Sequence, residues 1–444
     1  MSGGLMQLVA YGAQDIYLTG NPQITFFKVV YRRHTNFAME AIEQTFMGTA
    51  DFGKKVTCLI SRNGDLIYRV YLNAELPATQ VGISGMWTND IGNHLIDNVN
   101  VEIGGQQIDK HYGDWLQIWA ALTVDASHRN GFNDMIGETL TLCTNNSAVK
   151  PATTLFIPLQ FWFCRNAGLA LPLIALQYHE VKINVTFRSF SSLWINTNTQ
   201  SQETLSLVSS ALWVDYIYLD TDERRRFAQV SHEYLIDQLQ FTGAETITST
   251  INKIRLNFNH PVKELIWVVQ KESHITVPSS SNNFAGNQWS NYQLAVFDVD
   301  TPFTPYDAPL YGGTGGNFST TGGITDVWNG NPTVVAKLQL NGQDRFAQRS
   351  GRYFNLVQVW QHHTNAPMSH GICVYSFGLK PEEHQPSGTC NFSRIDNATM
   401  QLTVDSDTFV DQNGTTTNAQ VRFYATNYNV LRIMSGMGGL AYSN

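Results

Sequence analysis

Neighbouring histidines are the residues of this chain that could do metal chemistry. His362 and His363 are adjacent, and His370 follows in the same segment. Zinc sites combine such imidazoles with cysteine or carboxylate ligands. The sequence around Trp360 has no nearby carboxylate. We therefore interpret these histidines as packing and surface residues and predict no metal site.

Two other segments have the residue types of an active site without its spacing. Glu382, Glu383 and His384 could supply a general base, but they stand between Pro381 and Pro386, which favour an extended turn. The glycine-rich run GGTGG lacks the Lys-Ser/Thr of a phosphate-binding loop. Neither a G-x-S-x-G nor an H-E-x-x-H motif occurs in the sequence. We predict no catalytic residue, no cofactor and no enzymatic activity.

The cysteines predict free thiols in a reducing compartment. They are odd in number and form no C-x-x-C pair, the close spacing typical of disulfide scaffolds and zinc knuckles. They are Cys58, Cys143, Cys164, Cys373 and Cys390. The N-terminus has no basic region followed by a long apolar core, and the apolar stretch 169–176 is too short to span a bilayer. We expect a chain made in the cytosol, with no transmembrane segment.

Six asparagines lie in N-x-S/T sequons, the acceptor pattern for N-glycosylation. They are Asn145, Asn184, Asn317, Asn391, Asn397 and Asn413. Such matches arise readily by chance in a chain rich in Asn and Thr, and a cytosolic product would not meet the usual transferase. The candidate glycosylation sites are Asn317, Asn391, Asn397 and Asn413, with Asn317 as the first choice because it lies in a long glycine-rich loop.

The composition is typical of a chain that contacts other proteins. Charged residues make up only 14% of the chain and hydrophobic residues 43%, and charged side chains are depleted in interface cores. The net charge is −8, and neither end has a basic tail, so we predict no direct binding of nucleic acid. One basic run, Arg224 to Arg226, follows Asp222 and Glu223 and is interpreted as a solvated or salt-bridged connector.

Two stretches far apart in the chain are copies of one another. VEIGGQQID begins at Val101, and LQLNGQDRF begins at Leu338, 237 positions later. Each precedes an aromatic segment of similar sequence, YGDWLQIW from Tyr112 and YFNLVQVW from Tyr353. This spacing indicates duplication of a whole domain, since solenoid repeats recur every ~20 to 50 residues. A duplicated fold without a duplicated catalytic motif favours an architectural role.

Strand periodicity predicts an all-β fold. In residues 181–187 every second residue is apolar, which places Val181, Ile183, Val185 and Phe187 on one face of a half-buried strand. Similar alternation occurs in 98–103, 253–259 and 400–404. Antiparallel sheets with one wet face give this pattern.

Two antiparallel sandwiches in tandem are therefore expected, each with a small helix after a strand. Asp114 could cap the first of these helices, which carries Trp115 and Trp119, and residues 353–361 mirror it. We place an N-terminal arm at 1–24, the first domain at 25–220, a linker at 221–235 and the second domain at 236–444.

Six sequence runs spread over almost the whole chain match those of a known family. They are YGAQDIYLTGNPQITFFK from Tyr11, VYRRHTNF from Val30, SRNGDL from Ser61, LDTDERRRF from Leu219, NFNHPVKEL from Asn257 and LKPEEHQPSG from Leu379. These runs resemble the major capsid protein of nucleocytoplasmic large DNA viruses, closest to its algal, chlorella-virus type. Several exceed eight residues, so the resemblance is highly specific.

The resemblance implies a double jelly roll, meaning two tandem eight-stranded antiparallel jelly rolls with short helical insertions. It implies a structural protein of the virion whose homotrimer forms a pseudo-hexagonal capsomer of the icosahedral shell, assembled in the host cytoplasm. Its implied partners are further copies of itself, minor capsid proteins and penton proteins. The arm would lie beneath the capsomer, where its lack of charge favours packing against protein. Relatives from algal viruses can carry glycans made by viral enzymes, so the resemblance also implies that this protein could be a glycoprotein.

A second function class stays open, because jelly rolls also serve as lectins and carbohydrate-binding modules. The long loops at 279–290 and 311–331 are typical of binding elements. Trp289, Tyr292 or Trp328 could form an aromatic platform there for host cell-surface carbohydrate. A cupin enzyme would need clustered histidine ligands on strands, and that spacing is absent from the sequence.

Overall fold

The computed structural model describes residues 3–144, 147–196, 204–276, 286–294, 330–366, 371–411 and 414–442. The chain divides into two units, Met1–Phe37 and Ala38–Asn444. The smaller unit contains two short helices, α1 (Gly3–Val9) and α2 (Ile16–Thr19), and neither has a buried residue. Among the described residues, no helix is long and apolar enough to cross a membrane.

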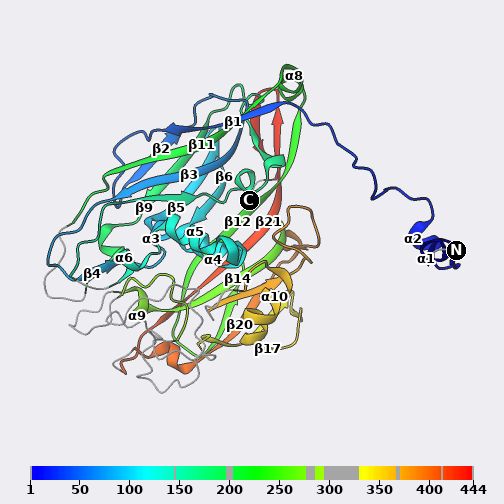
Figure 1. Cartoon of the computed structure of the whole chain (residues 1–444). Helices are drawn as coiled ribbons and strands as arrows, with labels where there is room; N and C mark the ends of the chain where they lie inside the picture. The colour runs from blue at the N-terminus through cyan, green and yellow to red at the C-terminus, as the bar shows by residue number, and fades with distance from the viewer. Residues whose placement is uncertain are drawn as a thin grey trace. The chain divides into compact units, whose positions relative to one another are not determined.

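In the larger unit, the first half of the chain forms two four-stranded antiparallel paths, β1-β11-β3-β7 and β2-β9-β5-β6 (Figure 1). Their bounds are β1 (Phe37–Gln44), β2 (Lys55–Leu59), β3 (Leu66–Leu76), β5 (Ile96–Ile103), β6 (Gln106–Tyr112), β7 (Thr153–Pro158), β9 (Val181–Phe187) and β11 (Ser209–Leu219). Short additions are β8 (Leu171–Pro172), which pairs with β3, and the pair β4 (Gly85–Trp87) with β10 (Trp194–Asn196).

The second half forms the paths β12-β21-β14-β18 and β13-β20-β15-β16. Their bounds are β12 (His232–Ile247), β13 (Ile251–Arg255), β14 (Pro261–Lys271), β15 (Thr333–Leu340), β16 (Gln343–Asp344), β18 (Ile372–Ser376), β20 (Ala398–Val404) and β21 (Ala419–Met434). Three short strands extend these sheets: β17 (Arg349–Ser350), β19 (Cys390–Asn391) and β22 (Met437–Leu440).

The two sandwiches have the same topology. When the eight main strands of each are counted along the chain, one sheet has the order first, eighth, third, sixth, and the other has second, seventh, fourth, fifth. This identity confirms the duplication that the repeated sequence indicates.

The repeated motif forms the same hairpin in both sandwiches. Gly104 and Gly105 connect β5 to β6 with φ of 58° and 84°, and Asn341 and Gly342 connect β15 to β16 with φ of 49° and 81°. Two-residue hairpins favour turns with positive φ at both positions, which Gly and Asn adopt most easily. The Gly-Gly and Asn-Gly pairs therefore set the register of each hairpin.

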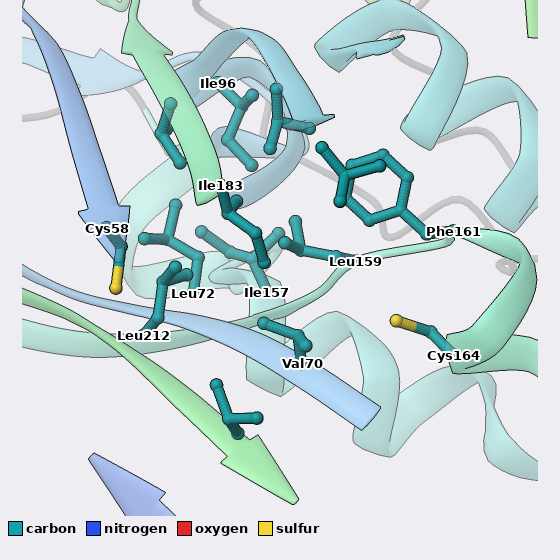
Figure 2. Packing of buried hydrophobic residues seen from close by; sticks show 14 of the residues in the cluster. Cys58, Val70, Leu72, Ile96, Ile157, Leu159, Phe161, Cys164, Ile183 and Leu212 are labelled. Atoms are coloured by element: carbon teal, nitrogen blue, oxygen red, sulfur yellow. The ribbon is translucent and has the colours of Figure 1, made fainter. Parts of the chain in front are cut away.

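The first core lies between the facing sheets of the first sandwich. Figure 2 shows Leu72 of β3 and Ile157 of β7 beside Ile183 of β9, and all three are at most 1% exposed. The predicted strand 181–187 coincides with β9, and its Val181, Ile183, Val185 and Phe187 are all buried. The alternation was therefore a correct guide to the core face.

The first core also contains residues from the end of the chain. Leu431 and Ile433 of β21, and Ile236 of β12, belong to it and are at most 1% exposed. The two long strands thus extend from the second sandwich into the hydrophobic core of the first.

The helices are short, and most connect strands. They are α3 (Ile91–Leu95), α4 (Gly113–Thr123), α5 (Ala126–Ile136), α6 (Leu140–Cys143), α7 (Trp162–Arg165), α8 (Thr221–Gln229), α9 (Glu272–Ile275), the π-helical turn η4 (Tyr353–Val357) and α10 (Gln358–His362). The five cysteines are free thiols, as predicted. The sequence analysis missed α5, which buries only Arg129, Asn133 and Ile136 and so has little apolar periodicity.

Candidate functional site

Helix α4 attaches the first sandwich to the second (Figure 1). It packs on the outer face of the sheet β12-β21-β14-β18, a contact that we call the seam. The apolar residues of the seam are Trp115, Ile118, Trp119, Ala121 and Leu122 of α4, with Ile266, Val268, Ile372, Val374 and Tyr424 of that sheet, Val359 of α10, and Tyr292. Because a helix with every face buried must lie between two packed bodies, α4 belongs to both sandwiches.

A buried carboxylate lies at the seam beside this apolar contact. One oxygen of Asp114 lies 3.1 Å from Arg422 of β21, and the other lies 3.3 Å from both Arg188 and His94. Burial alone would raise the pKa of Asp114, but the two arginines hold it well below its usual range. Burial also lowers the pKa of His94. The prediction that Asp114 caps α4 is wrong, since Tyr112 is the N-cap residue and makes no side-chain cap bond.

The segment 286–294 also lies at the seam. Trp289 stacks under the guanidinium of Arg188, 3.9 Å from its ring centroid, and donates from Nε1 to the carbonyl of Ser192 at 2.7 Å. Tyr292 is fully buried in the seam cluster. The prediction that Tyr292 is an exposed sugar platform is therefore wrong, and Trp289 is committed to structural contacts. Trp328 lies outside the described residues.

His363 lies in a buried ion-pair network, contrary to the prediction that no carboxylate is near. Its Nε2 is 3.0 Å from Glu264 of β14, and its Nδ1 is 2.8 Å from Glu382. Burial would lower the pKa of His363, but the two glutamates raise it to about 9. Glu382 also accepts from the backbone N–H of Thr364 at 2.9 Å. The network ties Glu382, in the turn after β18, to β14. The carbonyls of Glu383 and His384 accept from Lys263 Nζ and the Tyr428 hydroxyl, so the motif has structural contacts.

Sequence reasoning missed these carboxylates because Glu264 and His363 are distant in the chain. His370 lies outside the described residues. Within the described ranges, no group of three or more His, Cys, Asp or Glu side chains could hold a metal ion.

The remaining predicted positions are dispersed over the fold. Asn391 is exposed, but its Oδ1 accepts from the N–H of Ser393 at 3.0 Å. Asn397 is exposed at the end of the β15-β16 hairpin, where its N–H donates to Asn341. Asn184 is buried on β9. Asn145, Asn317 and Asn413 lie outside the described residues.

The basic run forms part of α8 in the connection between the sandwiches. Arg224 pairs with Asp65 at 3.1 Å, so the predicted salt-bridged connector is confirmed at this residue. Glu223 donates its backbone N–H to Asp220, the N-cap residue of the helix.

The N-terminal unit exposes many large apolar side chains. Tyr17 is 89%, Phe26 is 87% and Phe27 is 97% exposed. Monomeric soluble proteins rarely expose so much contiguous apolar surface unless it binds something. Asp15 is the only acidic residue of this unit. Its basic residues, Lys28, Arg32 and Arg33, all lie in its last ten positions, so the preceding residues 1–27, in which Asp15 is the only charged side chain, suit an apolar protein surface.

The fold and the seam define a double jelly roll, in which two antiparallel sandwiches of the same topology pack against one another. Two family models match the chain: "Major capsid protein N-terminus" over residues 25–220, and "Large eukaryotic DNA virus major capsid protein" over residues 223–439. The chain belongs to the family of major capsid proteins of large eukaryotic DNA viruses.

Relatives are similar over their whole length. The chain is 51% identical to a major capsid protein of Phaeocystis pouchetii virus and 46% identical to one of Paramecium bursaria Chlorella virus 1, with full coverage of both chains in each case. Among solved structures, a quasi-atomic model of the PBCV-1 virus capsid matches with a TM-score of 0.74 and 40% identity, over 95% of this chain and all of that one. The Faustovirus major capsid protein shares the fold, with a TM-score of 0.72 at 13% identity.

Proposed function

We propose that three copies of this chain form a pseudo-hexagonal capsomer and that capsomers tile the outer icosahedral shell of a large DNA virus. The observation that supports this most is the identical strand order of the two sandwiches. Three such chains would present six similar sandwiches around one axis, which suits a hexagonal lattice. The seam supports the proposal further, because it fixes two sandwiches as one rigid building block.

The test is the mass of the purified protein. Light scattering after size-exclusion chromatography should show one species of about 149 kDa, three times the chain mass of 49.8 kDa. Electron microscopy of shells assembled from this species would then give the lattice. A single-chain species at every concentration and salt condition would contradict the proposal.

We also infer that the N-terminal unit joins capsomers to neighbouring capsomers or to minor capsid and penton proteins. Its exposed aromatic side chains support this role, since interfaces are enriched in Phe and Tyr. Assembly would take place in the host cytoplasm, and the role would be structural with no catalysis. The chain is not expected to contact packaged DNA directly, because it carries a net charge of −8.

If the virion protein is glycosylated, we propose Asn397 over Asn391 among the described candidates. The Oδ1 of Asn391 accepts from Ser393, whose hydroxyl in turn accepts from the N–H of His260 at 2.7 Å. The Asn391 Oδ1 and the Ser393 hydroxyl oxygen of that sequon are thus both engaged in local hydrogen bonds. Peptide mass spectrometry of virion protein would locate any glycan, including at Asn317 or Asn413. An intact mass equal to that of the unmodified 49.8 kDa chain would contradict glycosylation of the virion protein.

A further inference from the structure

The two copies of the repeated aromatic segment differ in exposure. Trp119 of α4 is 4% exposed because the second sandwich covers it, whereas Trp360, its counterpart on α10, is 78% exposed. Val357, on the same side of the helix, is 40% exposed. Leu379 is 74% exposed and lies beside the helix, since its carbonyl accepts from His362 Nδ1 at 3.0 Å. We call Val357, Trp360 and Leu379 the α10 patch.

The sheet face on which α4 packs also has an uncovered counterpart, which lies in the first sandwich. By strand order, β3, β7 and β11 of the first sandwich correspond to β14, β18 and β21, whose outer face receives α4. The outward residues of the corresponding face include Tyr71, Trp213 and Phe156, because their chain neighbours belong to the first core. Tyr71 is the register partner of Trp213. Phe156 is 43% exposed, and Tyr71 and Trp213 are half-buried.

The repeat therefore gives each chain two equivalent helices, α4 and α10, and two equivalent outer sheet faces on which such a helix could pack. One of these helices, α4, already packs on one of these faces, that of β14, β18 and β21, within the chain at the seam. The α10 patch and the outward face that carries Tyr71, Trp213 and Phe156 are the equivalent surfaces that do not take part in the seam. The Nε1 of Trp213 is buried without a hydrogen-bond partner in the described part of the chain.

We infer that the α10 patch of one copy packs on the β3-β7-β11 face of the next copy, and that this contact repeats the seam between chains. The inference rests on the proposed capsomer and names its interface. A contact between two different surfaces is head-to-tail, and it forms a closed ring when the rotation per subunit closes. In a ring of three chains, seams within chains would alternate with these contacts between chains.

The first experiment places a charge on each side of the contact. Trp360→Glu and Phe156→Glu should each convert the three-chain species to single chains at a concentration where the wild-type protein is assembled. Loss of a central aromatic anchor weakens such a contact by about 30-fold or more. The matched control is Val81→Glu, because Val81 is 85% exposed and belongs to neither surface. Circular dichroism of each variant must match the wild-type spectrum, which separates lost assembly from lost folding.

A cross-linking experiment tests the pairing directly. Trp360→Cys and Phe156→Cys would be placed on separate, differently tagged chains in a Cys390→Ser background, since Cys390 is the one native thiol that is not buried. A short bismaleimide should join the two tags when the chains are coexpressed and should give no product from either variant alone. Absence of the mixed product from assembled protein would overturn the inference.

The outcomes separate the inference from the proposed function. If the wild-type protein is a trimer and both charge variants remain trimers, the inference fails and the capsomer stands. If Trp360→Glu dissociates the trimer but Phe156→Glu does not, the α10 patch does not pack on the β3-β7-β11 face. The inference then fails, and another surface, such as the N-terminal unit, is the partner of the α10 patch. If the wild-type protein stays a single chain under all conditions, the proposed capsomer fails and the inference with it.

Discussion

Asp114 of the first sandwich and Arg422 of the second lie 3.1 Å apart in the interior of the protein. Asp114 also contacts Arg188, so one carboxylate serves two guanidinium groups, of which Arg422 is almost fully buried. Removing one partner of a buried ion pair leaves an uncompensated charge, which costs more than the pair itself contributes. The seam therefore depends on Asp114 as well as on its apolar contacts.

Asp114→Asn should lower the free energy of unfolding by about 3 to 5 kcal/mol. The amide keeps the shape of the carboxylate but leaves both arginines without a counter-charge. The measurement is chemical denaturation, with Asp134→Asn on the exposed side of α5 as the control. The control should stay within about 0.5 kcal/mol of wild type. Equal stability of the two variants would refute the role of the buried pair.

The His363 network predicts a pH dependence of stability. The pKa of His363 is raised from 6.5 to about 9 in the folded protein, so its contribution is fully present below pH 6.5 and is lost as the pH rises through 9. The pKa of Glu264 is lowered, so its contribution is present above 4.5 and is lost as the pH falls through its folded value. The network should therefore stabilise the fold most between these limits.

His363→Gln should be less stable than wild type at pH 6, on the order of 3 kcal/mol. This difference should shrink steadily between pH 6.5 and 9. Thermal unfolding over that range measures it, and His128→Gln is the control because His128 is exposed. A difference between wild type and His363→Gln that does not change with pH would show that the two glutamates do not hold the histidine charged.

Two glycine substitutions should have opposite effects. Gly342 has a φ of 81° and no atom within 4 Å of an added Cβ, so Gly342→Ala should cost about 1 kcal/mol through backbone strain alone. Gly131 lies inside α5 with the same open space and no positive φ, so Gly131→Ala should stabilise the fold by about 0.5 to 1 kcal/mol. Both values come from denaturation curves. A stabilising Gly342→Ala would contradict the positive φ of the hairpin turn, and a destabilising Gly131→Ala would contradict the helical placement of Gly131.

Deletion of residues 2–20 should leave trimers intact and impair assembly of shells. Every helical residue in this stretch is unburied, so its loss removes no core contact from the larger unit. Light scattering measures the trimer, and electron microscopy counts closed shells. Normal shells from the deletion variant would rule out a linking role for this stretch.

Local sequence patterns predicted the local parts of this fold. The alternation in residues 181–187 marked β9, and the repeated VEIGGQQID and LQLNGQDRF segments marked two equivalent parts of the fold, each of which forms a hairpin in the structure. The repeated segment also located α4 and α10. These features depend on residues that are close in the chain, where periodicity and turn chemistry act directly.

The parts that the sequence did not predict depend on distant partners. Asp114 was expected to cap a helix, but Arg422 arrives from the other end of the chain and makes it a buried ion pair. His363 was expected to lack carboxylates because Glu264 lies on another strand. The resemblance to a known family supplied the capsid role, which neither the strand pattern nor the composition could distinguish from that of a lectin.

The contribution of β21 to the first core has a consequence for synthesis of the chain. Leu431 and Ile433 complete a core whose other fully buried residues all lie at or before Ile236 of β12. During synthesis the first sandwich therefore leaves the ribosome with an unfilled apolar site, and the missing residues emerge only after the other main strands of the second sandwich. Multidomain proteins usually fold from the N-terminus during synthesis. We expect this chain to finish both halves together after translation, so a truncated product would expose apolar surface in both.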